Sequence, residues 1–186
     1  MNHPLGTIIT LSGLHGTGKS TYAKALSEEF KLRSVSAGRL FRQLAQESGF
    51  TLLEMTRKAE EDGTFDRTID NMIAQEAETG NVILDGQLCA WLIQDRPHLA
   101  IFLAAPDHIR FERIAARDRL SPDEAKRVTL DREEAEKTRF LKLYGFDITD
   151  LSIYHLIVDT NLSPLPTMII TLKNIVRDYI QEKPRR

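Results

Sequence analysis

Short apolar runs alternate with longer stretches of helical periodicity along this chain of 186 residues. Continuous apolar or β-branched runs predict five short strands, at residues 7–12, around Val35, and at 82–84, 99–103 and 156–158. Apolar residues spaced near the helical period predict helices at 19–30, 39–48, 52–62, 65–78, 107–117, 121–144 and 166–180. Parallel strands need crossover connections, which are usually helical, so this order predicts an α/β fold: a five-stranded parallel sheet with helices on both faces.

The helical segments are unevenly distributed between the strands. Three of them follow one another between residues 39 and 78 and predict an inserted helical lobe. The segment at 121–144 opens with Ser121 and Pro122, residues typical of a helix N-terminus. At 1.5 Å per residue this helix would be about 36 Å long if unbroken, a length that leaves room for a hinge.

The composition is that of an ordered globular protein, with 41% hydrophobic and 28% charged residues. Lys and Arg total 25 and Asp and Glu total 27, so the net charge is −2 and no global positive field attracts nucleic acid. The lone Cys89 excludes an internal disulfide and a Cys-based metal cluster. The first residues lack the features of a signal peptide, and no run of about 18 apolar residues predicts a membrane span. We therefore expect a soluble, cytoplasmic, single-domain monomer with no nucleic-acid or membrane partner.

Residues 13–20, GLHGTGKS, fit the Gly-x-x-x-x-Gly-Lys-Ser pattern between a predicted strand and a predicted helix. Glycines let the backbone turn its amides toward one point, and the N-terminus of the following helix adds partial positive charge, so the segment can hold phosphate oxygens. We expect Lys19 to contact the β- and γ-phosphates and the Ser20 hydroxyl to bind Mg²⁺. Thr21 is expected to contact a further phosphate oxygen. The expected cofactor-binding residues of this loop are Gly13, His15, Gly16, Thr17, Gly18, Lys19, Ser20 and Thr21.

Two residues near this loop have simpler alternative interpretations. His15 lies at the tip of the loop, where we expect an exposed side chain that does not act as an acid or base. Asp85 ends an apolar strand, and ligands bind at the carboxyl ends of parallel strands, so its carboxylate can hold Mg²⁺ directly or through water. The alternative is an Asp-Gly pair that only forms a turn.

Seven of the sixteen arginines lie within thirty residues of the chain. Their spacing of three, four or seven residues places two sets on helix faces that could close over a polyphosphate, which guanidinium groups bind in a fork. The alternative is a solvated helix with salt bridges to interleaved acids, which we expect for Arg110, Arg119 and Arg127. For the others both interpretations stay open. The seven are Arg110, Arg113, Arg117, Arg119, Arg127, Arg132 and Arg139.

Taken together, these motifs resemble those of the nucleoside monophosphate kinases, most closely the archaeal-type cytidylate (CMP) kinases. The resemblance covers almost the whole chain and rests on TLSGLHGTGKST at 10–21, VSAGRLFR at 35–42, FDRTID at 65–70, VILDG at 82–86, the Arg113 and Arg117 pair, DREEAEKTRFLKLYGFD at 131–147 and SIYHLIVDT at 152–160.

The family resemblance implies the P-loop NTP hydrolase fold as one domain over residues 1–186. Its core would comprise residues 7–36, 80–110 and 145–182. A nucleotide-monophosphate-binding insertion would span about 37–79, and an arginine-rich lid about 111–140.

The resemblance also implies an acceptor site. Ser36, Gly38 and Arg42 match the segment that holds the acceptor nucleotide, with Arg42 on its phosphate. FDRTID resembles the segment that reads the base, which puts Asp66, Arg67 and Asp70 near the pyrimidine. Cytosine offers an N4 amino donor beside N3 and O2 acceptors, so Asp can accept from N4 and Arg can donate to N3 or O2. Without the resemblance, these residues would fit a helix cap and an i, i+3 charge pair.

On the donor side, the resemblance puts Arg113 against the adenine of ATP and Arg117 on its phosphates. Arg132 and Arg139 would lie between the donor and acceptor phosphates, and with Lys19 and Arg117 they form the expected catalytic set. Asp159 begins a loop, up to Leu162, that resembles the one bordering the adenine.

The chain departs from the family at two positions. Arg39 stands where the family often has an acid, and Gln87 stands where it has an arginine two positions after the strand-end acid. Gln87 can donate a hydrogen bond to phosphate but carries no charge. We therefore hypothesise that Arg39 compensates from the neighbouring segment, the alternative being weaker or altered acceptor binding.

The resemblance implies reversible transfer of the γ-phosphoryl group from Mg·ATP to CMP or dCMP. The acceptor phosphate is already anionic at neutral pH, so positioning and charge neutralisation suffice without a side-chain base. The alternatives are an adenylate kinase or another small-acceptor P-loop kinase, and a nucleotide-binding regulator without catalysis. A GTPase switch is disfavoured because no Asn-Lys-x-Asp segment occurs.

Overall fold

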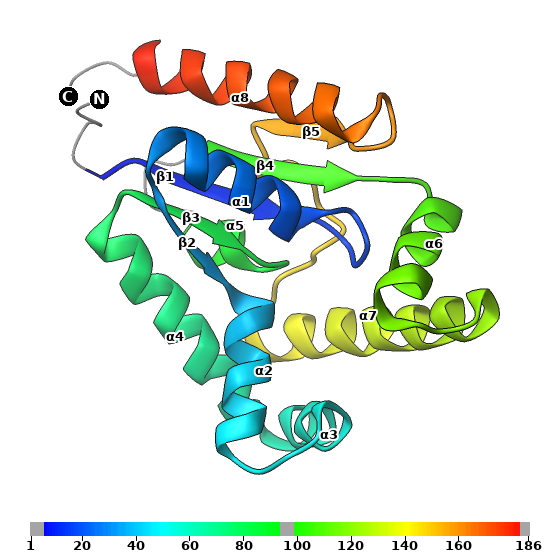
Figure 1. Ribbon diagram of the computed structural model, residues 1–186. Coiled ribbons are helices and arrows are strands. Elements are labelled where there is room, and N and C mark those ends of the chain that lie inside the picture. Colours follow the sequence, from blue (N-terminus) through cyan, green and yellow to red (C-terminus); the bar gives the residue numbers. More distant parts are fainter. Residues whose placement is uncertain (1–5, 94–98, 183–186) are drawn as a thin grey trace.

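The computed structural model describes residues 6–93 and 99–182. The basic run KPRR at 183–186, which the sequence predicts to be a solvated end, lies outside the described residues. Its centre is a five-stranded parallel sheet with strand order β2-β3-β1-β4-β5 (Figure 1). The strands are β1 (Ile8–Ser12), β2 (Arg33–Ser36), β3 (Val82–Asp85), β4 (Leu99–Ala104) and β5 (Leu156–Asp159). Five parallel strands were predicted, and the structure confirms them.

Helices connect the strands and form the insertion between β2 and β3. They are α1 (Lys19–Phe30), α2 (Ala37–Glu47), α3 (Leu52–Asp62), α4 (Thr64–Thr79), α5 (Cys89–Leu92), α6 (Asp107–Asp118), α7 (Pro122–Tyr144) and α8 (Leu165–Glu182). The seven longer ones agree with the prediction to within about two residues at most ends. The sequence did not predict α5, because four residues are too short to show a helical period.

The alternation of side chains along the strands divides the core into two layers. In β1, Ile9 and Leu11 pack with α1 and α8 on one face, while Ile8 packs with α4 and α5 on the other. The short runs are apolar on both sides because both faces are covered by helices, as parallel sheets require. Helices on both faces of the sheet, another expectation, are therefore also confirmed.

The register of the three strands β2, β3 and β1 aligns their carboxyl ends. Asp85 at the end of β3 is paired with Leu11 of β1 on one side and with Ser36 of β2 on the other. In the sheet, β2 and β3 lie on one side of β1 and β4 and β5 lie on the other. The strand order therefore reverses at β1, and open α/β sheets bind ligands at such a topological switch point, beyond the carboxyl ends of the strands. The segments after β1, β2 and β3 consequently meet in one place.

Helix α7 runs below the sheet from α6 to the helices of the insertion (Figure 1). Ser121 caps its N-terminus, with its hydroxyl 3.3 Å from the Glu124 amide, and Gly145 ends it in a left-handed conformation. The helix is continuous between these caps, so the hinge for which its length left room is absent. No helix in the described part of the chain is long and apolar enough to span a membrane.

Candidate active site

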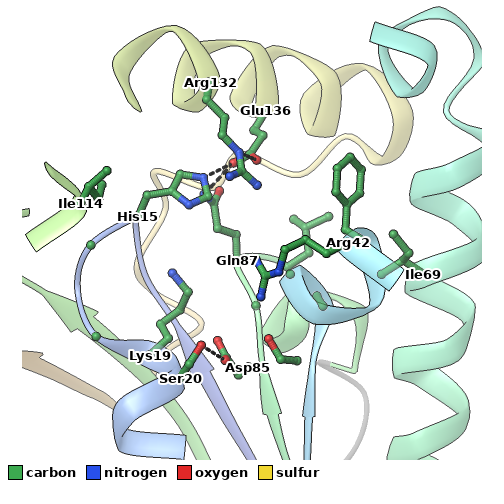
Figure 2. A pocket seen from close by; sticks show the side chains of 18 of the residues that line it. His15, Lys19, Ser20, Arg42, Ile69, Asp85, Gln87, Ile114, Arg132 and Glu136 are labelled. Atoms are coloured by element: carbon green, nitrogen blue, oxygen red, sulfur yellow. Dashed lines mark hydrogen bonds and ion pairs between the residues drawn. The ribbon is translucent and has the colours of Figure 1, made fainter. Parts of the chain in front are cut away.

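A cavity of about 990 Å³ opens at the carboxyl ends of the strands. Its walls come from the loop after β1, the segments after β2 and β3, and helices α1, α2, α4, α6 and α7 (Figure 2). This volume lies at the upper end of ordinary ligand pockets and has room for more than one small molecule. The cavity is therefore the candidate active site.

The loop at residues 13–20 passes closely between β4 and α6. A Cβ on Gly13 would lie 2.2 Å from the Leu103 carbonyl oxygen, and one on Gly16 would lie 2.5 Å from the Arg110 carbonyl oxygen. Both glycines have positive φ, so a side chain at either position would meet backbone atoms and strain the chain. The glycines of the motif thus serve the close packing that shapes the loop.

Helix α1 begins at Lys19 and presents an uncapped N-terminus to the cavity. Gly18 is its N-cap residue, no side chain caps the helix, and no acid lies in its first turn. The first amides of a helix have no intrahelical partner and carry partial positive charge, so this terminus suits an anion. Of the predicted loop residues, the cavity is lined by His15, Gly16, Gly18, Lys19, Ser20 and Thr21.

Lys19 extends along the loop with its ammonium near the backbone. Its Nζ donates to the carbonyl oxygens of Gly13, at 2.7 Å, and Leu14, at 3.0 Å. Burial lowers the pKa of Lys19, and the nearby Asp85 carboxylate opposes this shift. Thr17 is buried behind the loop, where its hydroxyl donates to the Leu14 oxygen at 2.8 Å. Gly13 and Thr17 therefore shape the loop and do not line the cavity.

Ser20 and Asp85 form an oxygen pair at the base of the cavity. The Ser20 hydroxyl donates to Asp85 Oδ2 at 2.7 Å, and Asp85 is buried. Mg²⁺ takes oxygen ligands, keeps several waters and is commonly held by one or two protein groups with substrate phosphates, so this donor set fits it. Among the described residues no cluster of three or more His, Cys, Asp or Glu forms an all-protein metal site.

The segment after β2 provides the opposite wall. Ser36, Gly38 and Arg42 line the cavity, and a Cβ on Gly38 would lie 3.8 Å from Arg42 Nη1. Figure 2 shows Arg42 and Lys19 pointing into the same space. The structure does not bring Arg39 to Gln87: Arg39 is exposed, its guanidinium donates to the Ser34 carbonyl oxygen at 3.1 Å, and it does not line the cavity. The compensation hypothesised for Arg39 has no support in this arrangement.

Two carboxylates of α4 meet residues of α7. Arg139 Nε lies 2.9 Å from Asp66 Oδ2 in a buried ion pair, and the Tyr144 hydroxyl donates to Asp70 Oδ2 at 2.5 Å. Burial raises the pKa of Asp70 to about 6, although the Tyr144 hydrogen bond opposes this shift. Burial also raises the pKa of Asp66, against the charge of Arg139. Arg67 is exposed and does not line the cavity, whereas both Asp residues do.

Arg139 retains an unused donor. Its Nη1 atom is buried without a hydrogen-bond partner within the described residues. Buried polar groups are normally satisfied, so a buried guanidinium N–H on a cavity wall marks a place for an acceptor. A phosphate oxygen meets that requirement.

Arg113 and Arg117 lie on the cavity wall formed by α6. Arg113 donates to the Thr160 hydroxyl at 3.0 Å and so connects α6 to the end of β5. Arg117 is exposed and paired with Asp118 through two contacts of 2.6 and 2.7 Å. Asp159 is exposed, accepts from the Asn161 amide at 2.8 Å and does not line the cavity.

Arg110 is a correction to the sequence analysis. We expected a solvated arginine, but its side chain is 2% exposed and donates to Asp107, Glu133 and the His15 carbonyl oxygen. The salt bridges were anticipated, whereas the burial was not. The reason is that the N-terminal part of α6 packs directly on the phosphate-binding loop. Arg119 and Arg127 are exposed, as expected.

His15 is a second correction. Its side chain is 19% exposed, and its Nε2 lies 2.8 Å from Glu136 Oε2 and 3.1 Å from Gln87 Nε2. The sequence analysis missed Glu133 and Glu136, although Glu136 stands four residues after Arg132, the spacing of an ion pair on one helix face. It also missed Tyr144. Acids within a long charged helix are usually solvent-exposed, so these carboxylates gave no distinctive signal.

Comparisons with known proteins agree with this geometry. A family model described as an AAA domain matches residues 9–139. The chain is 42% identical to a cytidylate kinase of Ignicoccus hospitalis over 170 residues, which is 91% of this chain and 99% of the relative. It is 41% identical to a cytidylate kinase of Staphylothermus marinus over 176 residues, 94% of this chain and 97% of the relative. A shikimate kinase from Bacteroides thetaiotaomicron shares the fold, with a TM-score of 0.63 at 17% identity over 92% of this chain and 98% of that structure.

Proposed function

The chain belongs to the cytidylate kinase family, and we propose that it transfers the γ-phosphoryl group of ATP to the phosphate of CMP or dCMP within the cavity. The observation that carries this proposal is that one cavity joins two kinds of site. At one end lie the uncapped N-terminus of α1, Lys19 and the Ser20–Asp85 pair. At the other end lie Arg42 and the carboxylates of α4, with arginines of α7 between the two ends.

The donor end suits the triphosphate of ATP. The α1 amides and the Lys19 ammonium would hold the β- and γ-phosphates, because both are positive groups on the same wall. Ser20 and Asp85 would hold Mg²⁺, which when bound neutralises charge on the β- and γ-oxygens. Arg113 Nη1 lies 3.0 Å from the Thr160 hydroxyl and 3.4 Å from the Gly16 carbonyl oxygen of the loop, where it would border the adenine. Arg117 would leave Asp118 for a phosphate oxygen.

The acceptor end suits a cytidine monophosphate. Arg42 would bind its phosphate, with Ser36 and Gly38 beneath the nucleotide. The cytosine edge presents an N4 amino donor, which matches an ionised carboxylate. Asp66 and Asp70 supply carboxylates on that wall, and Tyr144 fixes the orientation of Asp70.

Transfer between the two ends needs positioning more than proton chemistry. The acceptor phosphate is anionic near neutral pH and attacks without a side-chain base. Arg132 and Arg139 project from one face of α7 into the cavity and would disperse the charge of the transferring group. The unused Nη1 of Arg139 is a donor available for that purpose. Enclosure by α6 and α7 would limit the access of water.

An acceptor panel tests this proposal. ADP release from Mg·ATP is followed with CMP, dCMP, UMP, AMP and GMP as acceptors, each at the same concentrations. We expect the highest kcat/KM with CMP or dCMP and little release without an acceptor. Higher kcat/KM with AMP would identify an adenylate kinase instead. ATP binding without acceptor-dependent ADP release would identify a regulator and contradict the proposal.

A further inference from the structure

Glu136 accepts hydrogen bonds from three separate segments of the chain. Its Oε1 accepts from Arg132 Nε at 2.8 Å on the same helix, and its Oε2 accepts from Gln87 Nε2 at 2.8 Å after β3. The same Oε2 lies 2.8 Å from Nε2 of His15 on the phosphate-binding loop. A carboxylate can only accept, so the imidazole carries its proton on Nε2. Figure 2 shows these side chains converging above Lys19.

This carboxylate is buried, yet it stays charged. Glu136 is 7% exposed, and burial alone would raise its pKa. The His15 hydrogen bond, the charge that His15 carries when it is protonated at low pH, and the Arg132 charge outweigh burial and lower the pKa of Glu136 to about 2. Burial lowers the pKa of His15 in turn, against the pull of Glu136. At neutral pH the arrangement is therefore an ionised carboxylate that receives donors from two neutral side chains and one guanidinium.

The geometry of Arg132 indicates what this carboxylate does. Its hydrogen bond to Glu136 uses Nε and so leaves the two terminal nitrogens free of that contact. Nearly half of the Arg132 side chain is exposed, and the residue lines the cavity. An exposed arginine would otherwise sample many rotamers, and ordering it costs conformational entropy. Glu136 removes part of that freedom and also ties Gln87 to the same point.

A second set of contacts holds α7 to the loop independently of Glu136. Glu133 Oε1 accepts from the His15 backbone amide at 2.9 Å and from Arg110 Nη1 at 2.6 Å. Arg110 Nη1 also donates to the His15 carbonyl oxygen at 2.8 Å. These contacts bind the backbone of the loop, whereas Glu136 binds side chains. Removing Glu136 should therefore leave α7 in place and alter only the groups that face the cavity.

We propose that Glu136 is a positioning residue for phosphoryl transfer, which fixes Arg132 and Gln87 against His15 of the phosphate-binding loop. This inference rests on the proposed kinase function. It also assigns a role to Gln87, which stands where the family resemblance implies an arginine. Gln87 is a neutral side chain that donates a hydrogen bond to the Glu136 carboxylate. An arginine at 87 would bring a second charge to the same carboxylate and compete with Arg132 for it.

The test uses Glu136→Gln and Glu136→Ala with Glu134→Gln as the matched control. Glu134 is an exposed residue two positions earlier on α7 and does not line the cavity, so its variant removes the same charge from the same helix. A misplacement of about 1 Å can reduce a rate on the order of 100-fold. We expect kcat with CMP to fall roughly 10- to 100-fold in the Glu136 variants, with the KM for ATP within about threefold of wild type. Glu134→Gln should keep the wild-type kcat.

A double-mutant cycle separates positioning from a purely structural role. If Glu136 acts through Arg132, then Arg132→Ala should lower kcat much less in the Glu136→Gln background than in wild type. Fully multiplicative effects would overturn the inference, as would a folded Glu136→Gln protein with kcat within twofold of wild type. Thermal unfolding of each variant controls for folding, and Glu136→Asp should recover part of the lost kcat. A wild-type protein without CMP-dependent ADP release would refute the proposed function itself. The mutant cycle is measured against an active wild-type protein, so its outcome bears only on the role of Glu136.

Discussion

Asp70 is a residue in which burial and a hydrogen bond from Tyr144 have opposite effects on the pKa. Its pKa is raised to about 6 by burial, so its protonation changes within an accessible pH range. The ionised form accepts a hydrogen bond, as cytosine N4 requires, whereas the protonated form donates one, as a carbonyl at the same position of uracil requires. The choice of pyrimidine should therefore depend on pH.

We expect the ratio of kcat/KM for CMP to that for UMP to rise as the pH increases through about 6. Since kcat/KM reports the free enzyme, the midpoint should follow the pKa of unliganded Asp70. We use the ratio because the phosphate of each acceptor itself titrates near pH 6. That titration changes kcat/KM for CMP and for UMP by the same factor, so it does not affect the ratio. The measurement is a pair of steady-state pH profiles between about pH 5 and 8.

Two variants control this prediction. Asp70→Asn cannot ionise and should give a ratio that is independent of pH. Tyr144→Phe removes a hydrogen bond that lowers the pKa of Asp70, so its midpoint should move to higher pH. A wild-type ratio that stays flat across this range would show that Asp70 does not read the base.

At the level of residues, the sequence predicted the parts of the site that carry local signatures. The Gly-rich loop and the strand-end Asp85 depend on spacing and position, and the structure places Lys19, Ser20 and Asp85 together in the cavity. Glu136 contacts His15 and Tyr144 contacts Asp70, and in each pair the two residues are more than 70 positions apart in the chain. Such long-range pairs leave no pattern in a single sequence, which is why they were missed.

The approach of α6 to the phosphate-binding loop depends on one glycine. A Cβ on Gly16 would lie 2.5 Å from the Arg110 carbonyl oxygen and 2.9 Å from its Cα, and backbone atoms of a helix cannot easily move away. We expect Gly16→Ala to displace the loop from α6 and to raise the KM for ATP at least tenfold, an estimate based on the cost of small misplacements. Steady-state kinetics with saturating CMP measure this effect.

Gly145→Ala is the matched control for this backbone change. Gly145 also has positive φ, 71°, but its added Cβ would meet nothing within 4 Å. This variant should lose about 1 kcal/mol of unfolding free energy, from backbone strain alone, and keep the wild-type KM for ATP. Equal KM values for the two variants would contradict the role assigned to the contact between Gly16 and Arg110.

Most elements were predictable because their apolar periods are clear. The error at α7 is instructive, since we allowed for a hinge on the basis of length. Kinks arise at proline, at glycine pairs or at bulges, and the helix after Pro122 contains no proline or glycine before its cap at Gly145. The absence of breakers is a better guide to continuity than length is.

Across the whole molecule, α7 contacts both ends of the cavity. It reaches the donor end through Glu136 and His15, and the acceptor end through Arg139 and Asp66. Because one continuous helix contacts both ends, we expect a ligand that orders α7 at one end to lower the entropic cost of binding at the other end. The sequence predicted the parallel sheet and a ligand site at the carboxyl ends of its strands, but not this placement of α7, which depends on tertiary contacts.

Binding at the two ends should therefore be coupled. Coupling free energies are typically 1–3 kcal/mol, which is about 5- to 150-fold in affinity. We expect a non-hydrolysable ATP analogue with Mg²⁺ to tighten CMP binding by at least about fivefold, and CMP to tighten binding of the analogue by the same factor. Isothermal titration calorimetry measures both. Arg139→Ala should weaken the coupling, and equal CMP affinities with and without the analogue would show that α7 does not link the sites.

The central claim is direct transfer of a phosphoryl group between two nucleotides in one cavity. The most direct measurement follows the label of [γ-³²P]ATP after mixing with the protein, Mg²⁺ and CMP. We predict that the label appears in CDP and not in inorganic phosphate, and that a folded Lys19→Met protein gives no labelled CDP. Label released as inorganic phosphate, or labelled CDP formed at the wild-type rate by Lys19→Met, would contradict the account.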